Sequence, residues 1–171
     1  MSIRYVIFVD LDGVLADFDR AVEELTGLPP SQQTPRAMWP RLAGARDFYA
    51  NIPWMPDGLE LWERVEPHDP VILTGLPRGD WAKPQKLEWC RRELGPEVPV
   101  IACMSREKTE KAREWLEARA GDAGPRVTER RVPVLIDDRA STREPWEAAG
   151  GVFIHHTSAA ESIRALEELG L

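Results

Sequence analysis

Five short apolar segments, spaced along the whole chain, constrain its fold more than any other feature of the sequence. Four of them are rich in Val and Ile, and the five occupy Arg4–Val9, Pro70–Leu73, Val98–Ala102, Pro133–Ile136 and Gly151–Ile154. Runs of this length and composition are typical of strands that are buried on both faces. A single run of this kind could equally form a buried helix, so the segments between the runs are needed to decide between strand and helix.

Those intervening segments have helical patterns. Helices are predicted at Gly58–Val65, Pro84–Leu94, Glu107–Ala120, Ser141–Ala149 and Ser158–Leu169. Asp57 is placed to cap the first of them, and Ser158 with Glu161 has the spacing of a capping box for the last. Alternating strands and helices predict an α/β fold, in which a Rossmann-like parallel sheet carries helices on both faces.

One proline-rich segment, Arg20–Pro53, does not follow this alternation. It has no strand pattern and is dense in aromatic residues, and two short helical stretches are expected within it, at Ala21–Leu25 and Arg36–Leu42. We predict that residues 20–53 form a small helical cap inserted after the first strand of a core made of 1–19 and 54–171. The alternative is an irregular crossover helix whose aromatic side chains belong to the core.

Composition excludes several classes of partner. The 22 Lys and Arg against 29 Asp and Glu give a formal net charge of −7, so a nucleic acid polymer is not expected to bind. No apolar stretch approaches the ~20 residues of a membrane span. Cys90 and Cys103 are the only two cysteines, and no secretory leader pattern is seen at the N-terminus. We therefore expect a cytoplasmic protein without membrane association.

Acidic residues follow two of the predicted strands. Asp10 and Asp12 end the first strand and precede Gly13, which permits a sharp turn, and Asp137 with Asp138 ends the fourth. In an open α/β sheet the carboxyl ends of the strands meet at the ligand-binding edge. Carboxylates gathered there would repel one another without a divalent cation, and an all-oxygen set suits Mg²⁺. A calcium loop is disfavoured, because no Glu stands at the closing position.

A hydroxyl group and two lysines accompany these acids. Thr74 and Gly75 end the second strand, which suits phosphate binding, although a turn-forming Thr is the commoner role. Lys86 and Lys108 lie near the starts of the two helices that follow, where the helix dipole disfavours a cation unless an anion is bound. Either lysine alone would be read as a surface residue. Together they favour a site for a small phosphorylated ligand.

The order of these motifs resembles the haloacid dehalogenase superfamily. Asp10–Leu15, Thr74, Lys86 or Lys108, and Asp137-Asp138 are similar to its four motifs. Within it, the segments DLDGVLADF, ILTG, SREKT and LIDDR resemble the 5'(3')-deoxyribonucleotidase family, although Gly75 stands where that family usually has a second hydroxyl residue.

The resemblance implies a Mg²⁺-dependent phosphomonoester hydrolase that forms an aspartyl-phosphate. Asp10 would be the nucleophile and Asp12 the general acid and base. The ion would be held by the Asp10 carboxylate, the Asp12 main-chain carbonyl and Asp138, with Asp137 as a further acid. Thr74, the Gly75 amide and Lys108 would hold the phosphate, Lys86 would help to neutralise it, and Arg139 would orient the acid pair.

The expected substrate is a nucleoside or deoxynucleoside monophosphate. Five aromatic residues in or beside the expected cap could stack on its base: Phe18, Trp39, Phe48, Tyr49 and Trp54. They could equally belong to the core or to the interface of a homodimer. Two alternatives stay open, namely hydrolysis of a sugar phosphate or other small phosphometabolite, and a phosphate-binding module without turnover.

Overall fold

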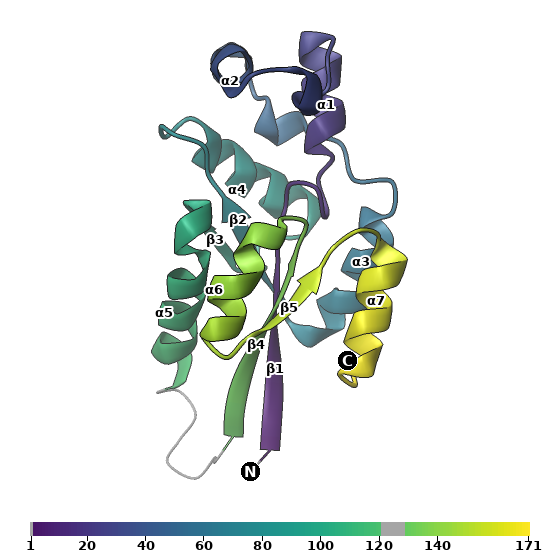
Figure 1. Cartoon of the computed structure of the whole chain (residues 1–171), viewed down its shortest axis with the longest axis vertical. Coiled ribbons are helices and arrows are strands. Elements are labelled where there is room, and N and C mark those ends of the chain that lie inside the picture. The colour runs from purple at the N-terminus through teal and green to yellow at the C-terminus, as the bar shows by residue number, and fades with distance from the viewer. Residues whose placement is uncertain (1, 121–128) are drawn as a thin grey trace.

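The computed structural model describes residues 2–120 and 129–171, and its centre is a five-stranded parallel sheet (Figure 1). The strand order is β3-β2-β1-β4-β5. The bounds are Ser2–Val9 for β1, Val71–Gly75 for β2, Val100–Cys103 for β3, Glu129–Asp137 for β4 and Val152–His155 for β5. Each corresponds to one of the predicted strands. β4 begins four residues earlier than predicted, because its polar first half pairs in register with the first residues of β1.

Seven α-helices lie within the described residues. They are α1 Phe18–Thr26, α2 Pro35–Gly44, α3 Gly58–Val65, α4 Ala82–Glu93, α5 Lys108–Ala120, α6 Arg143–Ala148 and α7 Ala159–Glu168. Short 3-10 helices occur at Pro30–Gln32, Tyr49–Asn51, Glu66–His68, Ser105–Glu107 and Ala140–Thr142. The α/β fold and the helices on both faces of the sheet, predicted from the alternating pattern, are confirmed.

Alternate side chains of the strands build two hydrophobic cores. Ile7 and Val9 of β1 face the core under α3, α4 and α7, whereas Phe8 faces the core under α5 and α6. In the second core the Phe8 ring makes edge-to-face contacts with Trp115 and Trp146, with centroid distances of 5.8 and 5.6 Å. Where both faces of the strands are covered, the strand sequences are almost continuously apolar.

The segment between β1 and α3 lies over the carboxyl ends of the strands, at the top of Figure 1. It contains α1 and α2, and its buried side chains, such as Val22 and Leu42, join the hydrophobic cluster of one face of the sheet. The division into a core and a cap at residues 20–53 stays a prediction, because this hydrophobic cluster is continuous across the boundary.

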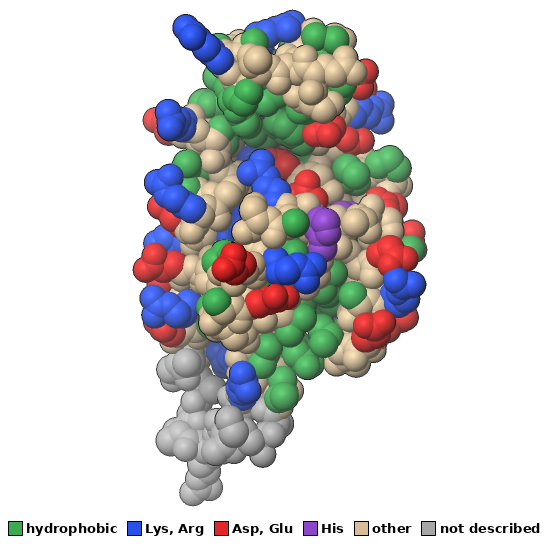
Figure 2. Space-filling view, in the orientation of Figure 1, with side chains coloured by type: hydrophobic (Ala, Val, Ile, Leu, Met, Phe, Trp, Pro, Cys, Tyr) green, Lys and Arg blue, Asp and Glu red, His purple; other side chains and the backbone are tan. Residues whose placement is uncertain are grey.

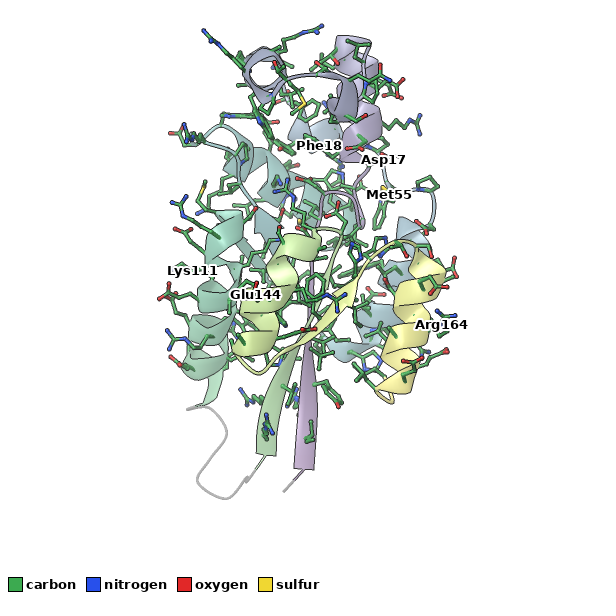
Figure 3. All side chains as sticks on the ribbon, viewed as in Figure 1. Asp17, Phe18, Met55, Lys111, Glu144 and Arg164 are labelled. Atoms are coloured by element: carbon green, nitrogen blue, oxygen red, sulfur yellow. The ribbon has the colours of Figure 1, made fainter. Side chains whose placement is uncertain are left out.

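The two connections of this segment run side by side. The Asp17 amide donates to the Pro53 carbonyl at 2.8 Å, and the Met55 amide donates to the Leu15 carbonyl at 2.7 Å. Ala16 and Trp54 form an isolated antiparallel bridge between them. Asp17, Phe18 and Met55 mark this junction in Figure 3. The segment therefore leaves and re-enters the sheet domain at one point.

The capping predictions have different outcomes. Ser158 caps α7, its hydroxyl accepting from the Glu161 amide at 3.2 Å. Asp57 makes no side-chain cap on α3; its carboxylate accepts from the Ala159 amide at 2.7 Å, at the start of α7. The prediction that Asp57 caps α3 was wrong, since its carboxylate binds the start of α7 instead. This is possible because α3 and α7 pack side by side and their first residues lie together. Within residues 2–120 and 129–171, no helix has both the length and the apolar composition needed to cross a membrane.

Candidate active site

The candidate site lies at the carboxyl edge of the three central strands. β1 lies between β2 and β4, so residues that follow these strands meet at one edge of the sheet. The chain proceeds from β1 outward to β2 and β3, and then returns to the other side for β4 and β5. This reversal creates the crevice in which open α/β sheets bind ligands.

Asp10 is buried directly after β1. Its main-chain amide donates to the Ile136 carbonyl of β4 at 2.9 Å. Its Oδ1 accepts from the Leu11 amide at 2.8 Å and lies 3.0 Å from Lys108 Nζ. Within the described parts of the chain, Oδ2 accepts no hydrogen bond, although Asp10 lines a cavity. One carboxylate oxygen is therefore fixed and the other is left for a ligand or a reaction.

Lys108 joins two of the predicted acids. Its ammonium lies 3.0 Å from Asp10 Oδ1 and 2.8 Å from Asp137 Oδ2, and all three side chains are almost fully buried. Burial alone would lower the pKa of Lys108, but the two carboxylates outweigh it and raise that pKa. An ammonium has three N–H donors. Two are used here, so one remains for a ligand oxygen.

Lys86 has a different environment. Its ammonium donates to Asp12 Oδ2 at 2.6 Å, Gly75 O at 2.7 Å and Thr74 Oγ1 at 3.0 Å. These three acceptors occupy all of its N–H groups, and the Tyr49 ring lies 4.4 Å away on a further side. Lys86 therefore positions Asp12 and the end of β2.

Asp12 is held by only one of its oxygens. Oδ2 is bound to Lys86, whereas the buried Oδ1 has no hydrogen-bond partner among the described residues. Burial raises the pKa of the Asp12 carboxyl, with the Lys86 ammonium opposing the rise. An unpartnered buried carboxylate oxygen is costly unless a proton or a ligand satisfies it.

Three carboxylates are arranged to hold a metal ion. One oxygen each from Asp10, Asp137 and Asp138 lies within 4.8 Å of the others. The pKa of Asp138 is raised to about 7, first by partial burial and then by repulsion from Asp10 and Asp137. An oxygen-only set with this much mutual repulsion fits Mg²⁺. The Asp12 carboxylate is not part of this group, since Lys86 binds it.

Gly13 makes room for this cluster. It has a φ of +77°, and a Cβ built on it would lie 2.4 Å from Asp138 Oδ2. Its amide donates to the Ala16 carbonyl at 2.8 Å, which closes the turn after β1. Only glycine fits both the backbone conformation and the approach of Asp138.

The expected role of Arg139 is not what the structure shows. The main-chain amide of Arg139, and not its guanidinium, donates to Asp137 Oδ1 at 2.8 Å. The Arg139 side chain lines the cavities beside the site. The amide fulfils the orienting role because it follows the acid pair by one residue, which leaves the side chain free to point elsewhere.

Two cavities open at this edge. The smaller, about 90 Å³, is lined by Asp10, Asp12, Tyr49, Gly75 and Ser105 among others. The larger, about 720 Å³, extends beneath α2 and along the loop between β2 and α4. The two cavities adjoin, because five residues contribute to both linings: Trp39, Leu76, Pro77, Ser105 and Arg139. In Figure 2, hydrophobic side chains gather in a hollow below the α1 and α2 region, with charged side chains beneath.

The five predicted aromatic residues are not equivalent. Trp39 lines both cavities and Tyr49 lines the smaller one. Phe18 and Phe48 pack around Tyr49 in the core, at centroid distances of 6.0 and 5.1 Å. Trp54 lies against another core tryptophan and donates its indole N–H to Glu93 at 2.8 Å. Only Trp39 and Tyr49 are therefore placed to contact a ligand.

Other cavity residues carried no sequence prediction of a role. Ser105, the first residue of the SREKT segment, lies so close to Gly75 that a Cβ there would be 2.5 Å from its hydroxyl. Trp81, at the start of α4, lines the larger cavity and contacts Tyr49 at a centroid distance of 5.3 Å. The position of Ser105 two residues after the end of β3 was the available signal. Nothing in the local sequence distinguishes Trp81 from a core tryptophan.

Comparison with known proteins identifies the fold. No family model and no curated protein matches the sequence. A solved hydrolase from Streptococcus pneumoniae TIGR4 superposes with a TM-score of 0.55 at 16% identity, covering 98% of this chain and 100% of that one. A Bacteroides fragilis protein described as a haloacid dehalogenase-like hydrolase gives a TM-score of 0.50 at 16% identity, with 95% and 93% covered. The chain therefore has the α/β fold of the haloacid dehalogenase-like hydrolases.

Proposed function

We propose that this protein is a Mg²⁺-dependent phosphomonoester hydrolase that works through an aspartyl-phosphate on Asp10. The observation that carries the proposal is the pairing of Asp10 and Asp12 in one small cavity, each with one carboxylate oxygen held by a lysine and one left free. The fold shared with hydrolases supports the enzyme class.

In the first step, Asp10 Oδ2 attacks phosphorus and the bond between phosphorus and the leaving oxygen breaks. Asp12, protonated on Oδ1, gives its proton to the departing alkoxide. Burial favours this protonated form, since it raises the pKa of Asp12. Lys86 fixes the orientation of the carboxyl through Oδ2.

In the second step, water attacks the phosphorus of the aspartyl-phosphate. The now ionised Asp12 takes a proton from this water, the bond to Asp10 breaks, and inorganic phosphate is released. We assign the phosphate contact to the remaining N–H of Lys108 and to Thr74, because all donors of Lys86 are used within the protein. The Gly75 amide is proposed as a further donor.

Mg²⁺ would be held by Asp10, Asp138 and the main-chain carbonyl of Asp12, with Asp137 beside them. When bound, it supplies positive charge that offsets the acids and the phosphate oxygens. Asp137 already accepts from Lys108 and from the Arg139 amide, so its main contribution is to fix its neighbours.

Nucleoside and deoxynucleoside monophosphates are the proposed substrates. The large cavity beside the site has the ~300–1,000 Å³ volume of an organic ligand site, and Trp39 at its junction with the small cavity offers a face for a base. The small cavity has room for the reacting phosphate only.

The test is phosphate release from nucleoside monophosphates and sugar phosphates, with Mg²⁺ or with EDTA. We expect release from nucleotides with Mg²⁺, none from Asp10→Asn, and an unchanged rate from the matched control Asp19→Asn, which alters an exposed acid of α1. Trapping of phosphate on wild-type protein and not on Asp10→Asn would identify the intermediate.

Phosphate release by Asp10→Asn at the wild-type rate would refute the covalent mechanism. Release from sugar phosphates alone would keep the mechanism and discard nucleotides. Indifference to EDTA would refute the metal assignment. If no ester is hydrolysed, the phosphate-binding module becomes the better description.

A further inference from the structure

The large cavity has a charge composition unlike the rest of the protein. Four arginines line it, namely Arg36 of α2, Arg78 of the loop after β2, Arg106 after β3, and Arg139 after β4. No Asp or Glu is among its lining residues in the described part of the chain. The whole chain, by contrast, has a net charge of −7. Four separate segments therefore deliver positive charge to one hollow of an acidic protein.

These four guanidinium groups also lack protein partners. None of them forms an ion pair or donates a side-chain hydrogen bond within residues 2–120 and 129–171. Eight arginines elsewhere do form ion pairs with a carboxylate: Arg20, Arg46, Arg64, Arg91, Arg92, Arg113, Arg143 and Arg164. Donors without partners around a cavity are available to a ligand.

The cavity walls between the arginines are apolar. Trp39 and Trp81 line it, together with prolines and Leu76. Guanidinium groups bind carboxylate or phosphate with two parallel hydrogen bonds. Arg139 lies where the large cavity joins the small one, whereas Arg36, Arg78 and Arg106 line only the large one.

We propose, resting on the phosphohydrolase function above, that the preferred substrates are phosphomonoesters carrying a second anionic group, a phosphate or a carboxylate. The reacting phosphate occupies the small cavity at Asp10. The body of the substrate lies along Trp39, and its second acid binds the arginines of the large cavity. Among nucleotides this narrows the proposed substrates toward bisphosphates, because a nucleoside monophosphate has no charge at this end and leaves Arg36, Arg78 and Arg106 unpaired.

Matched pairs of substrates test this preference. We would compare a nucleoside 5'-monophosphate with the 3',5'-bisphosphate of the same nucleoside, and glycerol phosphate with phosphoglycerate. We expect kcat/KM to be roughly fivefold higher for the member with the second acid, which is the upper end of the effect of one ion pair at an exposed position. The nucleoside pair reports on a second phosphate and the glycerol pair on a carboxylate. The preference should decrease between 50 and 500 mM salt, because exposed charges are screened.

Arginine variants locate the effect. Arg78→Gln and Arg106→Gln should each reduce the ratio of kcat/KM within a pair by roughly fivefold. Arg36→Gln should do the same, whereas Arg41→Gln is the matched control, since it alters an exposed arginine of the same helix outside the cavity. A ratio of kcat/KM near one for wild-type protein would overturn the proposal while leaving the phosphatase function intact. Equal effects of Arg36→Gln and Arg41→Gln on this ratio would do the same.

Binding separates this proposal from the function on which it rests. Calorimetry with Asp10→Asn measures affinity for both members of each pair without turnover. If wild-type protein hydrolyses none of them, the proposed function fails. Tighter binding of the second-acid member, weakened by Arg78→Gln, would still support the anion site, and equal binding of both members would overturn it.

Discussion

Replacing Gly13 by alanine would show whether the space beside the turn after β1 is reserved for the metal-binding acids. Gly13 has a φ of +77°, and the new Cβ would lie 2.4 Å from Asp138 Oδ2 and 2.8 Å from its Cγ. Cβ atoms essentially never approach closer than 3.0 Å, so the Asp138 carboxylate must move. As the far end of a flexible side chain, it can move at little cost in stability, but it then leaves Asp10 and Asp137.

Gly27 is the matched control. It ends α1 with a φ of +82°, and a Cβ there would meet nothing within 4 Å. Alanine in this conformation costs ~1–2 kcal/mol, offset by ~0.4–1 kcal/mol from the reduced freedom of the unfolded chain. Both variants should therefore lose about 1 kcal/mol of stability, or about 2–4 °C in Tm for a chain of this length.

The two variants should differ in metal binding. Mutating even a residue that only orients a metal ligand typically lowers metal affinity by about 10- to 100-fold, so displacing the ligand itself should cost at least as much. We expect a loss of this size for Gly13→Ala and none for Gly27→Ala, measured by calorimetric titration with Mg²⁺ alongside urea denaturation. Equal Mg²⁺ affinity in both variants would refute the assignment of Asp138 as a ligand that Gly13 admits.

Three further substitutions address the buried charges. Lys108→Met should destabilise the metal-free protein by about 3–5 kcal/mol in urea denaturation, because it leaves two buried carboxylates unpaired. Lys111→Met, on the outside of α5, is the matched control and should leave stability nearly unchanged. The pKa of Asp138 in the folded protein is raised to about 7, so its stabilising contribution is present at low pH and is lost as pH rises through 7. In EDTA, Asp138→Asn should therefore remove this decrease of the unfolding free energy with pH. An unchanged pH profile of stability would contradict the prediction. Lys86→Met should reduce kcat for alkyl phosphates by about 100-fold or more, because Lys86 positions the Asp12 carboxyl. The loss should be smaller for aryl phosphates, whose leaving groups need no proton from Asp12. Equal losses for the two kinds of ester would exclude the positioning of Asp12 by Lys86.

The sheet was predictable because burial on both faces leaves a local mark. The strand ends carry Asp10, Thr74 and Asp137, and parallel pairing alone requires them to meet at one edge. The predicted first and last residues of the helices also lie within a few residues of the observed ones, as α3 at Gly58–Val65 shows. These features depend on neighbours in sequence or on the sheet topology.

Partners far apart in sequence were not predictable. Lys86 was expected to contact phosphate, but its acceptors on Asp12 and the end of β2 depend on how α4 packs. The aromatic residues illustrate the same limit, since Trp54 packs in the core while Trp81 lines a cavity. A side chain's type does not reveal which surface it meets, and an exposed arginine such as Arg78 is ordinary until three others are found around the same hollow.

The paired connections at Leu15–Asp17 and Pro53–Met55 also bear on how such proteins diversify. Because the two ends are already hydrogen-bonded to each other, a change in the length of chain between them adds little entropic cost, since the entropy of closing a loop grows slowly with its length. A replacement segment would have to supply buried side chains in place of Val22 and Leu42, a cover for α4 where Tyr49 now packs, and a wall for the large cavity where Trp39 now lies. The residues that contact the body of the substrate can thus be replaced at this one pair of connections, while the acids and lysines at the sheet edge keep their positions.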